Sequence, residues 1–381
     1  MKLADIIETF ISGDWGEETV AEVTPNSVFC IRGADIVPIT NHCFKGIPQR
    51  FVCDKTIGNK TLKAGDLIIE KSGGSPTQST GRIVYVSEDL IKAKGNVVCS
   101  NFCTAFRVKT GWNPLYVYYY WQNVYNHGAF FNFEGKTTGI KNLQLDNALS
   151  AIDIEYLPLE KQNQIVASLA SIDEKIKVNR QINDNLEAQL RLITSRYIFS
   201  CPNLEKKRIG EIATVKAGGD CPITFSKTRT RKCNIPIFSN GTEDRGLYGF
   251  TNKAKIEGHS ITVAARGTIG YCERRLMPFV PIIRLLAITP KEDGAYIYLH
   301  QVIRGMKFNK NGSVQQQLTV PEISFIEIPY PHSGILHEYN KVASPIVEMI
   351  ERNISENEIL TKQRDELLPL LMNGQASVNS D

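Results

Sequence analysis

A coiled-coil heptad pattern occurs twice in the chain, and each copy predicts a long helix that needs a partner. In the first copy apolar or neutral residues recur in alternating steps of four and three, the spacing of a coiled-coil seam, and the second copy has the same steps. The first copy comprises Ile165, Leu169, Ile172, Ile176, Asn179, Asn183, Leu186, Leu190, Ile193 and Tyr197, and the second comprises Tyr339, Ala343, Ile346, Ile350, Asn353, Asn357, Leu360, Arg364, Leu367 and Leu371. Because either helix alone would expose an apolar stripe, we expect the two helices to pack against each other.

The second heptad copy is part of a longer internal repeat. Ile172, Ile176, Asn179, Asn183 and Leu186 recur 174 residues later as Ile346, Ile350, Asn353, Asn357 and Leu360. Residues 152–156 recur as 326–330 with the same displacement, and their alternation of apolar and polar side chains predicts a strand before each helix. The order is therefore globular, helix, globular, helix.

The globular parts repeat more loosely than the helices. Gly13-Asp14, which follows Ile6, matches Gly219-Asp220, which follows Ile212. Later, residues 67–69 run into the glycine-rich stretch 72–74 as residues 261–263 run into 266–268. We therefore expect the two heads to share one fold.

Asparagines occupy seam positions near the middle of each helix. If the helices pack antiparallel, Asn179 and Asn183 lie near Asn353 and Asn357, and their hydrogen bonds penalise shifted registers. The alternative is that these side chains face solvent. A helix of about 38 residues would be about 57 Å long. It could hold two heads along duplex DNA, whose turn is about 34 Å, which predicts a bipartite target with a non-specific gap.

Composition and charge narrow the class of protein. The 381 residues, 42% hydrophobic and 22% charged, suit two or three soluble domains. The absence of a long apolar run or signal-peptide pattern, together with nine irregularly spaced cysteines, predicts a cytoplasmic protein with no membrane partner. Residues 201–332 carry 19 basic and 11 acidic side chains, whereas residues 1–158 carry 15 and 16. The excess in the second head favours a polyanionic partner, without choosing between DNA and RNA.

Several motifs resemble those of the specificity subunits of type I restriction–modification systems. They are Leu157-Pro158-Leu159-Glu160-Lys161-Gln162-Asn163-Gln164-Ile165, Ile176-Lys177-Val178-Asn179, Glu70-Lys71-Ser72-Gly73-Gly74-Ser75 and Arg364-Asp365-Glu366-Leu367-Leu368-Pro369-Leu370-Leu371-Met372-Asn373-Gly374. The resemblance covers nearly the whole chain. It implies two target-recognition domains, each reading half of a split DNA sequence, and spacer helices that dock two methyltransferase (modification) subunits, which restriction subunits then join.

One departure from the family pattern concerns the start of the second helix. It begins Pro331-His332-Ser333-Gly334 and lacks the Leu-x-x-Gln start of the first helix, so the two docking surfaces need not be equivalent.

The expected fold is α+β. Two α/β target-recognition domains, related by a pseudo-two-fold axis, are separated by two long antiparallel coiled-coil helices. The expected bounds are 1–158 and 201–332 for the domains and 159–200 and 333–376 for the helices.

Catalytic motifs are weak in this sequence. Asn113-Pro114-Leu115-Tyr116 departs from the Asn-Pro-Pro-aromatic motif of adenine methyltransferases, and a turn before an aromatic helix explains it better. Gly135-Lys136-Thr137 lacks the first glycine of a phosphate-binding loop. Cys99, Cys103, Cys53 and His42-Cys43 do not have the spacing of zinc ligands, which favours buried thiols and no metal site.

Direct DNA readout needs polar and basic side chains on loops. The candidates are Lys71, Ser72, Gly73, Gly74, Thr77, Gln78, Ser79, Lys136, Thr137, Thr138 and Lys141 in the first head, and Lys227, Arg229, Arg231, Lys232, Arg266, Lys307, Lys310, Ser313, Gln315 and Gln316 in the second. The alternative is that they belong to ordinary surface loops and solvated charge runs.

The function implied by the resemblance is that of a non-catalytic subunit that binds double-stranded DNA and needs no cofactor of its own. S-adenosylmethionine, magnesium and ATP would belong to the partner subunits. Two alternatives stay open at this point: a DNA methyltransferase or nuclease with diverged motifs, and a free-standing DNA-binding regulator.

Overall fold

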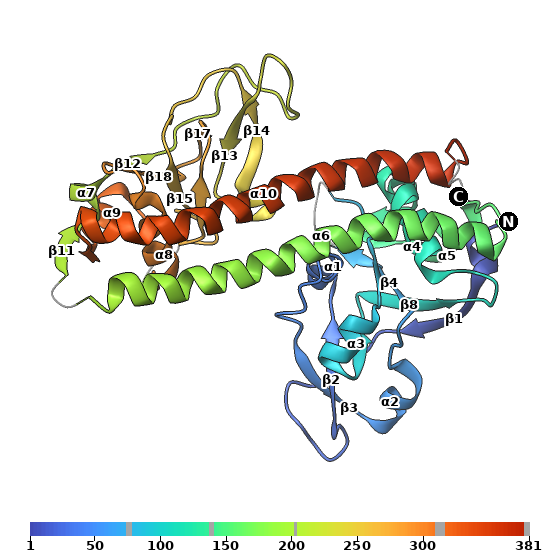
Figure 1. The fold of residues 1–381 in the computed structure, drawn as a ribbon. Coiled ribbons are helices and arrows are strands. Elements are labelled where there is room, and N and C mark those ends of the chain that lie inside the picture. Colours follow the sequence, from blue (N-terminus) through green and yellow to red (C-terminus); the bar gives the residue numbers. More distant parts are fainter. Residues whose placement is uncertain (74–77, 137–140, 202–203, 309–316, 377–381) are drawn as a thin grey trace. The chain divides into compact units, whose positions relative to one another are not determined.

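A computed structural model describes residues 1–73, 78–136, 141–201, 204–308 and 317–376 of the chain (Figure 1). The chain forms two compact units: unit 1 comprises residues 1–179 and 355–381, and unit 2 comprises residues 180–354. The helices α6 (Leu159–Thr194) and α10 (Ser333–Met372) each contribute one segment to each unit. They begin at the predicted residues, and α6 continues into a π-helical turn, Ser195–Phe199.

The globular part of unit 1 contains three sheets. Its strands are β1 (Ile7–Ser12), β2 (Asn26–Ile31), β3 (Gln49–Val52), β4 (Leu67–Glu70), β5 (Ser72–Gly73), β6 (Ile83–Tyr85), β7 (Val97–Cys99), β8 (Cys103–Val108), β9 (Glu134–Lys136) and β10 (Lys141–Leu143). Its helices are α1 (Ile36–Thr40), α2 (Asp54–Lys60), α3 (Glu88–Lys94), α4 (Pro114–Asn126) and α5 (Leu145–Ala151), with short 3-10 turns at Leu3–Ile6, Gly33–Asp35 and Ala129–Phe133. The sheet orders are β1-β8-β4-β6, β3-β2-β7 and β5-β10-β9.

Unit 2 repeats the four-stranded sheet of unit 1 and its three-stranded sheet β3-β2-β7. Its strands are β11 (Glu205–Arg208), β12 (Ala213–Ala217), β13 (Ile235–Phe238), β14 (Leu247–Thr251), β15 (Ser260–Val263), β16 (Cys272–Arg275), β17 (Val280–Pro281), β18 (Leu286–Pro290) and β19 (Glu327–Tyr330), and its helices are α7 (Ile209–Ile212), α8 (Ala295–Gly305) and α9 (Val320–Phe325), with a 3-10 turn at Glu243–Gly246. The order β12-β18-β15-β16 matches β1-β8-β4-β6. In the sheet β14-β13-β17, strand β13 pairs antiparallel with β14 and parallel with β17. Strand β2 pairs in the same way with β3 and β7. The predicted α+β class and the sharing of one fold by the heads are confirmed.

Two details of the predicted repeat are wrong. Residues 327–330 form a strand paired with β11, but residues 152–156 make only an isolated bridge between Lys2 and Asp153. The second wrong detail is the match of Gly13 with Gly219, because the structural counterpart of Gly13 is Gly218. A Cβ on Gly13 would lie 2.0 Å from the carbonyl oxygen of Ser100, the residue after β7. A Cβ on Gly218 would lie 2.7 Å from the nitrogen of Ile282, the residue after β17. Close backbone approach, which the sequence alone does not show, sets the correspondence.

The helical segments pack antiparallel within each unit, with the predicted seams turned inward. In unit 1, Asp173 of α6 forms an ion pair of 3.0 Å with Arg364 of α10. Asn179, later in α6, forms a hydrogen bond with Asn357, which precedes Arg364 in α10. In unit 2, Thr194 bonds to Tyr339 at 2.9 Å, while Asn183 meets Asn353. Contacting residues therefore have rising numbers along α6 and falling numbers along α10. This is the antiparallel arrangement that the repeat predicts.

The four seam asparagines make the same contacts twice. Asn179 Nδ2 donates to Asn357 Oδ1 at 2.9 Å, and Asn353 Nδ2 donates to Asn183 Oδ1 at 2.8 Å. The second member of each pair also donates to a helix carbonyl of the partner segment: Asn357 to Ile176, and Asn183 to Ile350. The predicted pairing is confirmed, and the alternative that these side chains face solvent is wrong for Asn179, which is 2% exposed. Their role in setting register stays a prediction.

Candidate nucleic-acid interface

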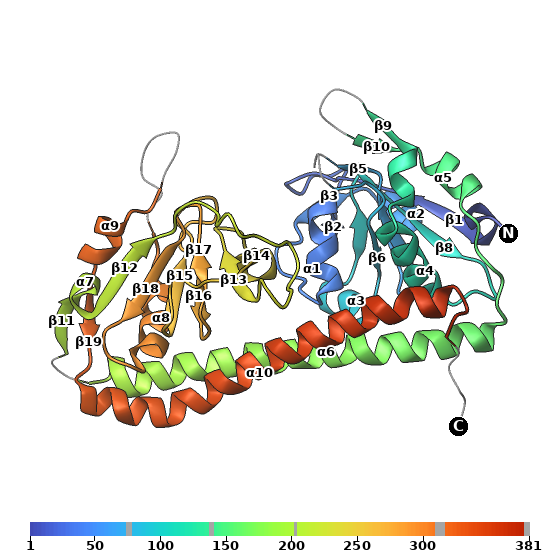
Figure 2. The ribbon, with the colours of Figure 1, turned by 90° about the horizontal axis from the view of Figure 1, so that it is seen from above.

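In unit 1 the small sheet β5-β10-β9 brings together two segments that the sequence proposed separately. Lys141 and Asn142 of β10 pair with Gly73 and Ser72 of β5, and Lys141 also pairs with Lys136 of β9. Figure 2 shows β9 and β10 on the side of unit 1 away from its helical segments. The two polar loops therefore form one surface.

Charges on this surface are partly compensated. Lys141 Nζ lies 3.2 Å from a carboxylate oxygen of Glu134 and 5.7 Å from the centre of the Phe131 ring. Burial acts to raise the pKa of Glu134, but hydrogen bonds from Thr80 and Lys141 outweigh it, and the net pKa lies below the usual value. Glu134 is thus ionised at neutral pH, and Lys141 is held in place by it, also donating to the Gln78 carbonyl oxygen at 3.2 Å. Gln78 itself is exposed.

Ser79 does not present its hydroxyl to solvent, which corrects its assignment to the readout group. Its residue is 6% exposed, and its Oγ donates to the Thr80 carbonyl oxygen at 3.0 Å. The Ser79 carbonyl oxygen accepts from Tyr125 of α4 at 2.9 Å. Ser79 therefore anchors the end of the loop to α4, because packing against the helix turned this side of the loop inward.

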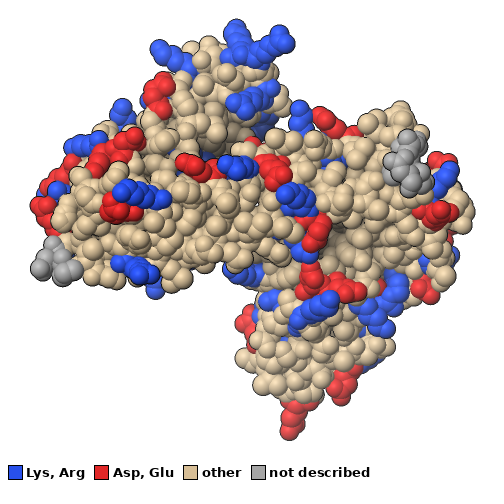
Figure 3. All heavy atoms as spheres, in the orientation of Figure 1, with Lys and Arg blue, Asp and Glu red and all other residues tan. Residues whose placement is uncertain are grey.

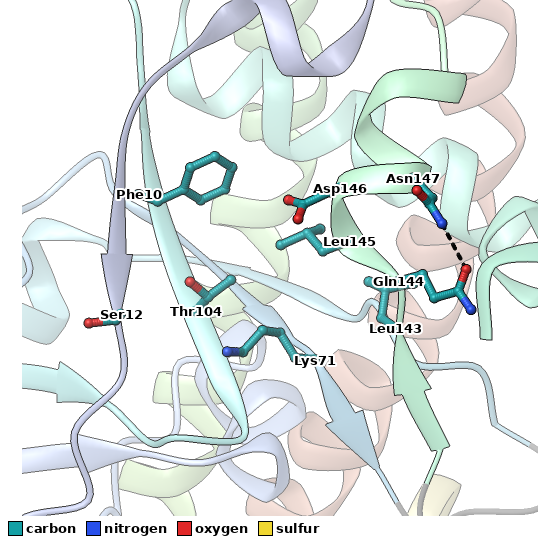
Figure 4. Close-up of a pocket in the computed structure, with 9 residues that line it drawn as sticks. All are labelled: Phe10, Ser12, Lys71, Thr104, Leu143, Gln144, Leu145, Asp146 and Asn147. Atoms are coloured by element: carbon teal, nitrogen blue, oxygen red, sulfur yellow. Dashed lines mark hydrogen bonds between the residues drawn. The ribbon is translucent and has the colours of Figure 1, made fainter. Parts of the chain in front are cut away.

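Lys71 lines a pocket of about 570 Å³ next to the small sheet (Figure 4). Its ammonium makes no hydrogen bond or ion pair with any residue that the structure describes. The other lining residues are Phe10, Ser12, Thr104, Leu143, Gln144, Leu145, Asp146 and Asn147. Gln144 Oε1 accepts from Asn147 Nδ2 at 2.9 Å. Sequence reasoning missed these polar residues because they come from four separate segments and carry no motif. The 48% exposure of the Phe10 side chain also appears only in the structure.

In unit 2 the predicted basic loop is exposed. Lys227, Arg229, Arg231 and Lys232 all lie at the surface, beside β13 and β14. The loop is fastened at its start, where Ser226 exchanges backbone hydrogen bonds of 2.9 and 2.8 Å with Phe250 and Lys227 Nζ lies 5.5 Å from the centre of the Tyr248 ring. Figure 3 shows Lys and Arg side chains gathered over the loops next to β13 and β14. This is the arrangement that phosphate contacts require.

Two further candidates of unit 2 are also exposed, Arg266 after β15 and Lys307 after α8. Arg266 Nε and Nη2 both donate to Gln317 Oε1, at 3.0 and 2.5 Å. Of the remaining candidates, Lys136 lies in β9, and the following lie outside the described residues: Gly74, Thr77, Thr137, Thr138, Lys310, Ser313, Gln315 and Gln316.

Comparison with known families decides the class of this protein. The family model described as "Type I restriction modification DNA specificity domain" matches residues 54–188 and again residues 203–368. The chain belongs to this specificity-subunit family. Each match takes in most of one head and part of the helix that follows it, so the family's domain occurs twice, in agreement with the internal repeat. Specificity subunits are the non-catalytic members of type I systems.

Named relatives agree with this assignment. A Mycoplasma pneumoniae protein named as a type I specificity subunit is 31% identical over 186 residues, 46% of this chain and 56% of the relative. A second one from the same organism is 28% identical over 195 residues, 48% of this chain and 52% of the relative. The chain thus spans about half the length of these relatives. The MjaIX specificity subunit of Methanocaldococcus jannaschii is 22% identical over 269 residues, 61% of this chain and 62% of that protein.

A solved structure shares the fold. The crystal structure of a type I restriction–modification S subunit from M. genitalium has a TM-score of 0.52 and 15% identity, covering 100% of this chain and 96% of that one. At this identity the likeness concerns the fold alone.

The family motif Leu-x-x-Gln at the start of α6 has an internal role in this specificity subunit. Gln162 is 0% exposed. Its side chain donates to the carbonyl oxygens of Gly111 and Leu157 and accepts from the Asn113 nitrogen at 2.8 Å. Because Gln162 is buried inside unit 1, its absence from the second helix does not by itself make the exposed helix surfaces differ.

The weak catalytic motifs have structural roles. Asn113 caps α4, its Oδ1 accepting from the Leu115 nitrogen at 2.8 Å, and the predicted aromatic helix follows. Gly135 and Lys136 lie in a strand, not in a loop before a helix. Cys99 and Cys103 are buried, as predicted, and burial raises the pKa of Cys103 to about 11. The prediction of buried thiols is wrong for Cys43, which is exposed after the end of α1, and for Cys53, which is half-buried at the start of α2. In the ranges that the structure describes, no three His, Cys, Asp or Glu side chains group as metal ligands, and no helix is long and apolar enough to cross a membrane.

Proposed function

We propose that this chain is a non-catalytic reader that binds a bipartite site in double-stranded DNA and docks two methyltransferase subunits, to which restriction subunits are added. The observation that carries the proposal is the duplication of the head together with its helical segment, seen in the sheets and in the asparagine contacts. A duplicated reader suits a target with two half-sites, as dimeric DNA-binding proteins suit paired half-sites. S-adenosylmethionine, magnesium and ATP are assigned to the partner subunits, and the complex to the cytoplasm.

The test is reconstitution with a modification subunit of a type I system. The chain alone, incubated with S-adenosylmethionine and plasmid DNA, is expected to transfer no methyl group. Mixed with the modification subunit, it is expected to form a complex whose mass corresponds to two modification subunits per chain and which methylates one split sequence. Methyl transfer or cleavage by the chain alone would contradict the proposal. Tight, sequence-specific DNA binding that needs no partner, together with failure to form the complex, would favour a free-standing regulator.

The basic loop of unit 2 is expected to contact phosphates. The double variant R229A/R231A should flatten the slope of log affinity against log salt by roughly 2, because each lost phosphate contact contributes about 0.9. Affinity should fall alike for cognate and unrelated duplexes, since phosphate contacts carry no sequence information. Binding titrations of the reconstituted complex at several salt concentrations measure the slope.

A matched control removes two exposed cations from β11. The double variant K206A/R208A lowers the net charge of unit 2 equally but lies on a different strand. It should change the slope of log affinity against log salt by less than about 0.5, which is less than the contribution of one phosphate contact. Equal slopes for the two double variants would show that the loop contributes only to the overall charge.

A further inference from the structure

The two units contain an equivalent backbone junction at the end of the third strand of the large sheet. In unit 1 the Leu143 nitrogen donates to the Lys71 carbonyl oxygen at 2.7 Å. In unit 2 the Leu318 nitrogen donates to the Ala265 carbonyl oxygen at 3.0 Å. One residue earlier, Gly81 donates to Glu70 and Gly270 donates to Ala264, both at 3.0 Å. The structure therefore aligns Lys71 with Ala265 and Leu143 with Leu318, although the number of residues between them differs.

A glycine beneath an aromatic ring marks the same junction in both units. Gly81 has φ of +94° and Gly270 has φ of +88°. A Cβ on Gly81 would lie 3.1 Å from the Phe130 ring, and one on Gly270 would lie 2.5 Å from the Phe308 ring. Both positions need glycine because of the backbone conformation and the ring above it. Two backbone hydrogen bonds, one glycine–ring approach and one positive φ agree between the units, so the alignment does not depend on sequence similarity.

The residues next to this junction form a polar pair in each unit, one after the strand residue and one before the leucine. By the alignment, Ser72 corresponds to Arg266 and Asn142 to Gln317. Ser72 Oγ donates to Asn142 Oδ1 at 2.5 Å, and Arg266 donates twice to Gln317 Oε1. The backbone is thus shared, whereas the side chains are short in unit 1 and long in unit 2. A position where a duplicated scaffold keeps its geometry and changes its side chains is suited to reading different sequences.

The chemistry of the longer pair fits guanine. Gln317 Oε1 holds the Nε edge of the guanidinium and so orients its plane. Among the described residues, Nη1 and one hydrogen of Nη2 have no acceptor. Those two donors match the O6 and N7 acceptors of guanine in the major groove. An amide partner carries no negative charge, and no carboxylate in the part of the chain that the structure describes pairs with Arg266. In contrast, carboxylates bind Arg245, Arg274 and Arg304 of the same unit, at 2.8, 2.5 and 2.8 Å.

We infer that Arg266, oriented by Gln317, reads a guanine in the half-site bound by unit 2, and that Ser72 with Asn142 takes the corresponding place in unit 1. The inference rests on the proposed function, because it requires that the heads bind duplex DNA. Arg266 acts as the base-contacting residue and Gln317 as a positioning residue.

Selection of preferred sites from a DNA pool randomised in both halves tests this, using the chain in complex with its modification subunits. R266A is expected to lose preference at one G·C pair in one half-site only, and affinity for the best wild-type site should fall roughly 10- to 100-fold. Q317A keeps the charge and should weaken discrimination at the same base pair several-fold, with unrelated DNA bound as before. R208A, which removes an exposed arginine of β11, should leave the selected sequence unchanged.

The outcomes separate the inference from the proposed function. If the wild-type complex selects no split sequence, the proposed function fails. If it does, and R266A selects the same sequence or weakens all positions equally, Arg266 is not a base reader and the inference is overturned. Should R266A be unstable, R266M decides: it keeps much of the side chain's length without a hydrogen-bond donor, and an unaltered preference for the G·C pair would overturn the inference.

Discussion

Replacing Glu187 by alanine is expected to destabilise unit 2 by about 3–5 kcal/mol, the cost typical of removing one partner from a buried ion pair. Glu187, on α6, accepts from Arg274 of β16 at 2.5 Å and from Arg304 of α8 at 2.8 Å. Arg274 is 4% exposed and its Nε lies 3.9 Å from Glu351 of α10. Without Glu187, the buried guanidinium loses its nearest counter-charge.

The other carboxylate near Arg274 replaces Glu187 poorly, because Glu351 already accepts from Arg245 at 2.9 and 3.1 Å and lies 3.9 Å from Arg274 Nε. Burial holds the pKa of His300 well below its usual value, and the charges of Arg274 and Arg304 lower it further. The imidazole is therefore neutral, and its Nδ1, 3.1 Å from Arg274 Nη1, can accept a hydrogen bond but supplies no negative charge. The network joins both helical segments of unit 2 to the large sheet and α8. Its loss should therefore loosen the head from its helices.

Urea unfolding can follow the two units separately. All three tryptophans, Trp15, Trp112 and Trp121, belong to unit 1, so their fluorescence reports that unit, whereas circular dichroism at 222 nm reports both. E187A should shift the dichroism transition more than the fluorescence transition. E338A, which breaks the exposed Lys341–Glu338 pair of the same unit, should leave both transitions nearly unchanged.

A double variant tests whether the unpaired buried charge of Arg274 causes the loss of stability in E187A. In E187L/R274M neither charge of the buried pair remains, so it should lose less stability than E187A. If the double variant is the less stable of the two, shape and not charge dominates at this position. A loss below about 1 kcal/mol in E187A, as for an exposed pair, would show that water reaches Arg274 readily.

Replacing Trp121 by alanine is expected to destabilise unit 1 by about 3–5 kcal/mol, the usual cost of truncating a large buried aromatic side chain. Trp121 is 0% exposed and stacks on Phe130 with ring centres 4.8 Å apart. Its Nε1 also donates to the Gly81 carbonyl oxygen at 2.7 Å. The residue thus supports the same glycine–aromatic junction that precedes the polar pair of unit 1.

W121F separates packing from the hydrogen bond. Phenylalanine fills most of the space but leaves the Gly81 carbonyl oxygen without its donor, a loss of about 1–3 kcal/mol. Fluorescence of Trp15 and Trp112 still reports unit 1 in both variants. W112A is a matched control, because Trp112 is 8% exposed and is expected to cost less. Equal costs for W112A and W121A would contradict the central place of Trp121 in the core.

What the sequence by itself determined follows from short-range periodicity. A heptad repeat assigns each residue to one face of a helix, so the two seams, the asparagine pairing and the antiparallel order could be predicted before any contact was known. The internal displacement of 174 residues likewise predicted two heads of one fold. The capping role of Asn113-Pro114 was also predictable, because helix caps depend mainly on local sequence. Thiol burial was predicted correctly for Cys99 and Cys103 but not for Cys43 and Cys53, because burial depends on packing between elements.

Only the tertiary structure decided which distant residues meet. Ser72 and Asn142 are 70 positions apart, and Arg266 and Gln317 are 51 apart, yet strand pairing and the junction backbone place each pair in contact. The inward turn of Ser79, the burial of Gln162 and the ion pairs of Glu187 arise in the same way. Such contacts depend on the order of strands and on close packing between elements, and residue spacing along the chain carries neither.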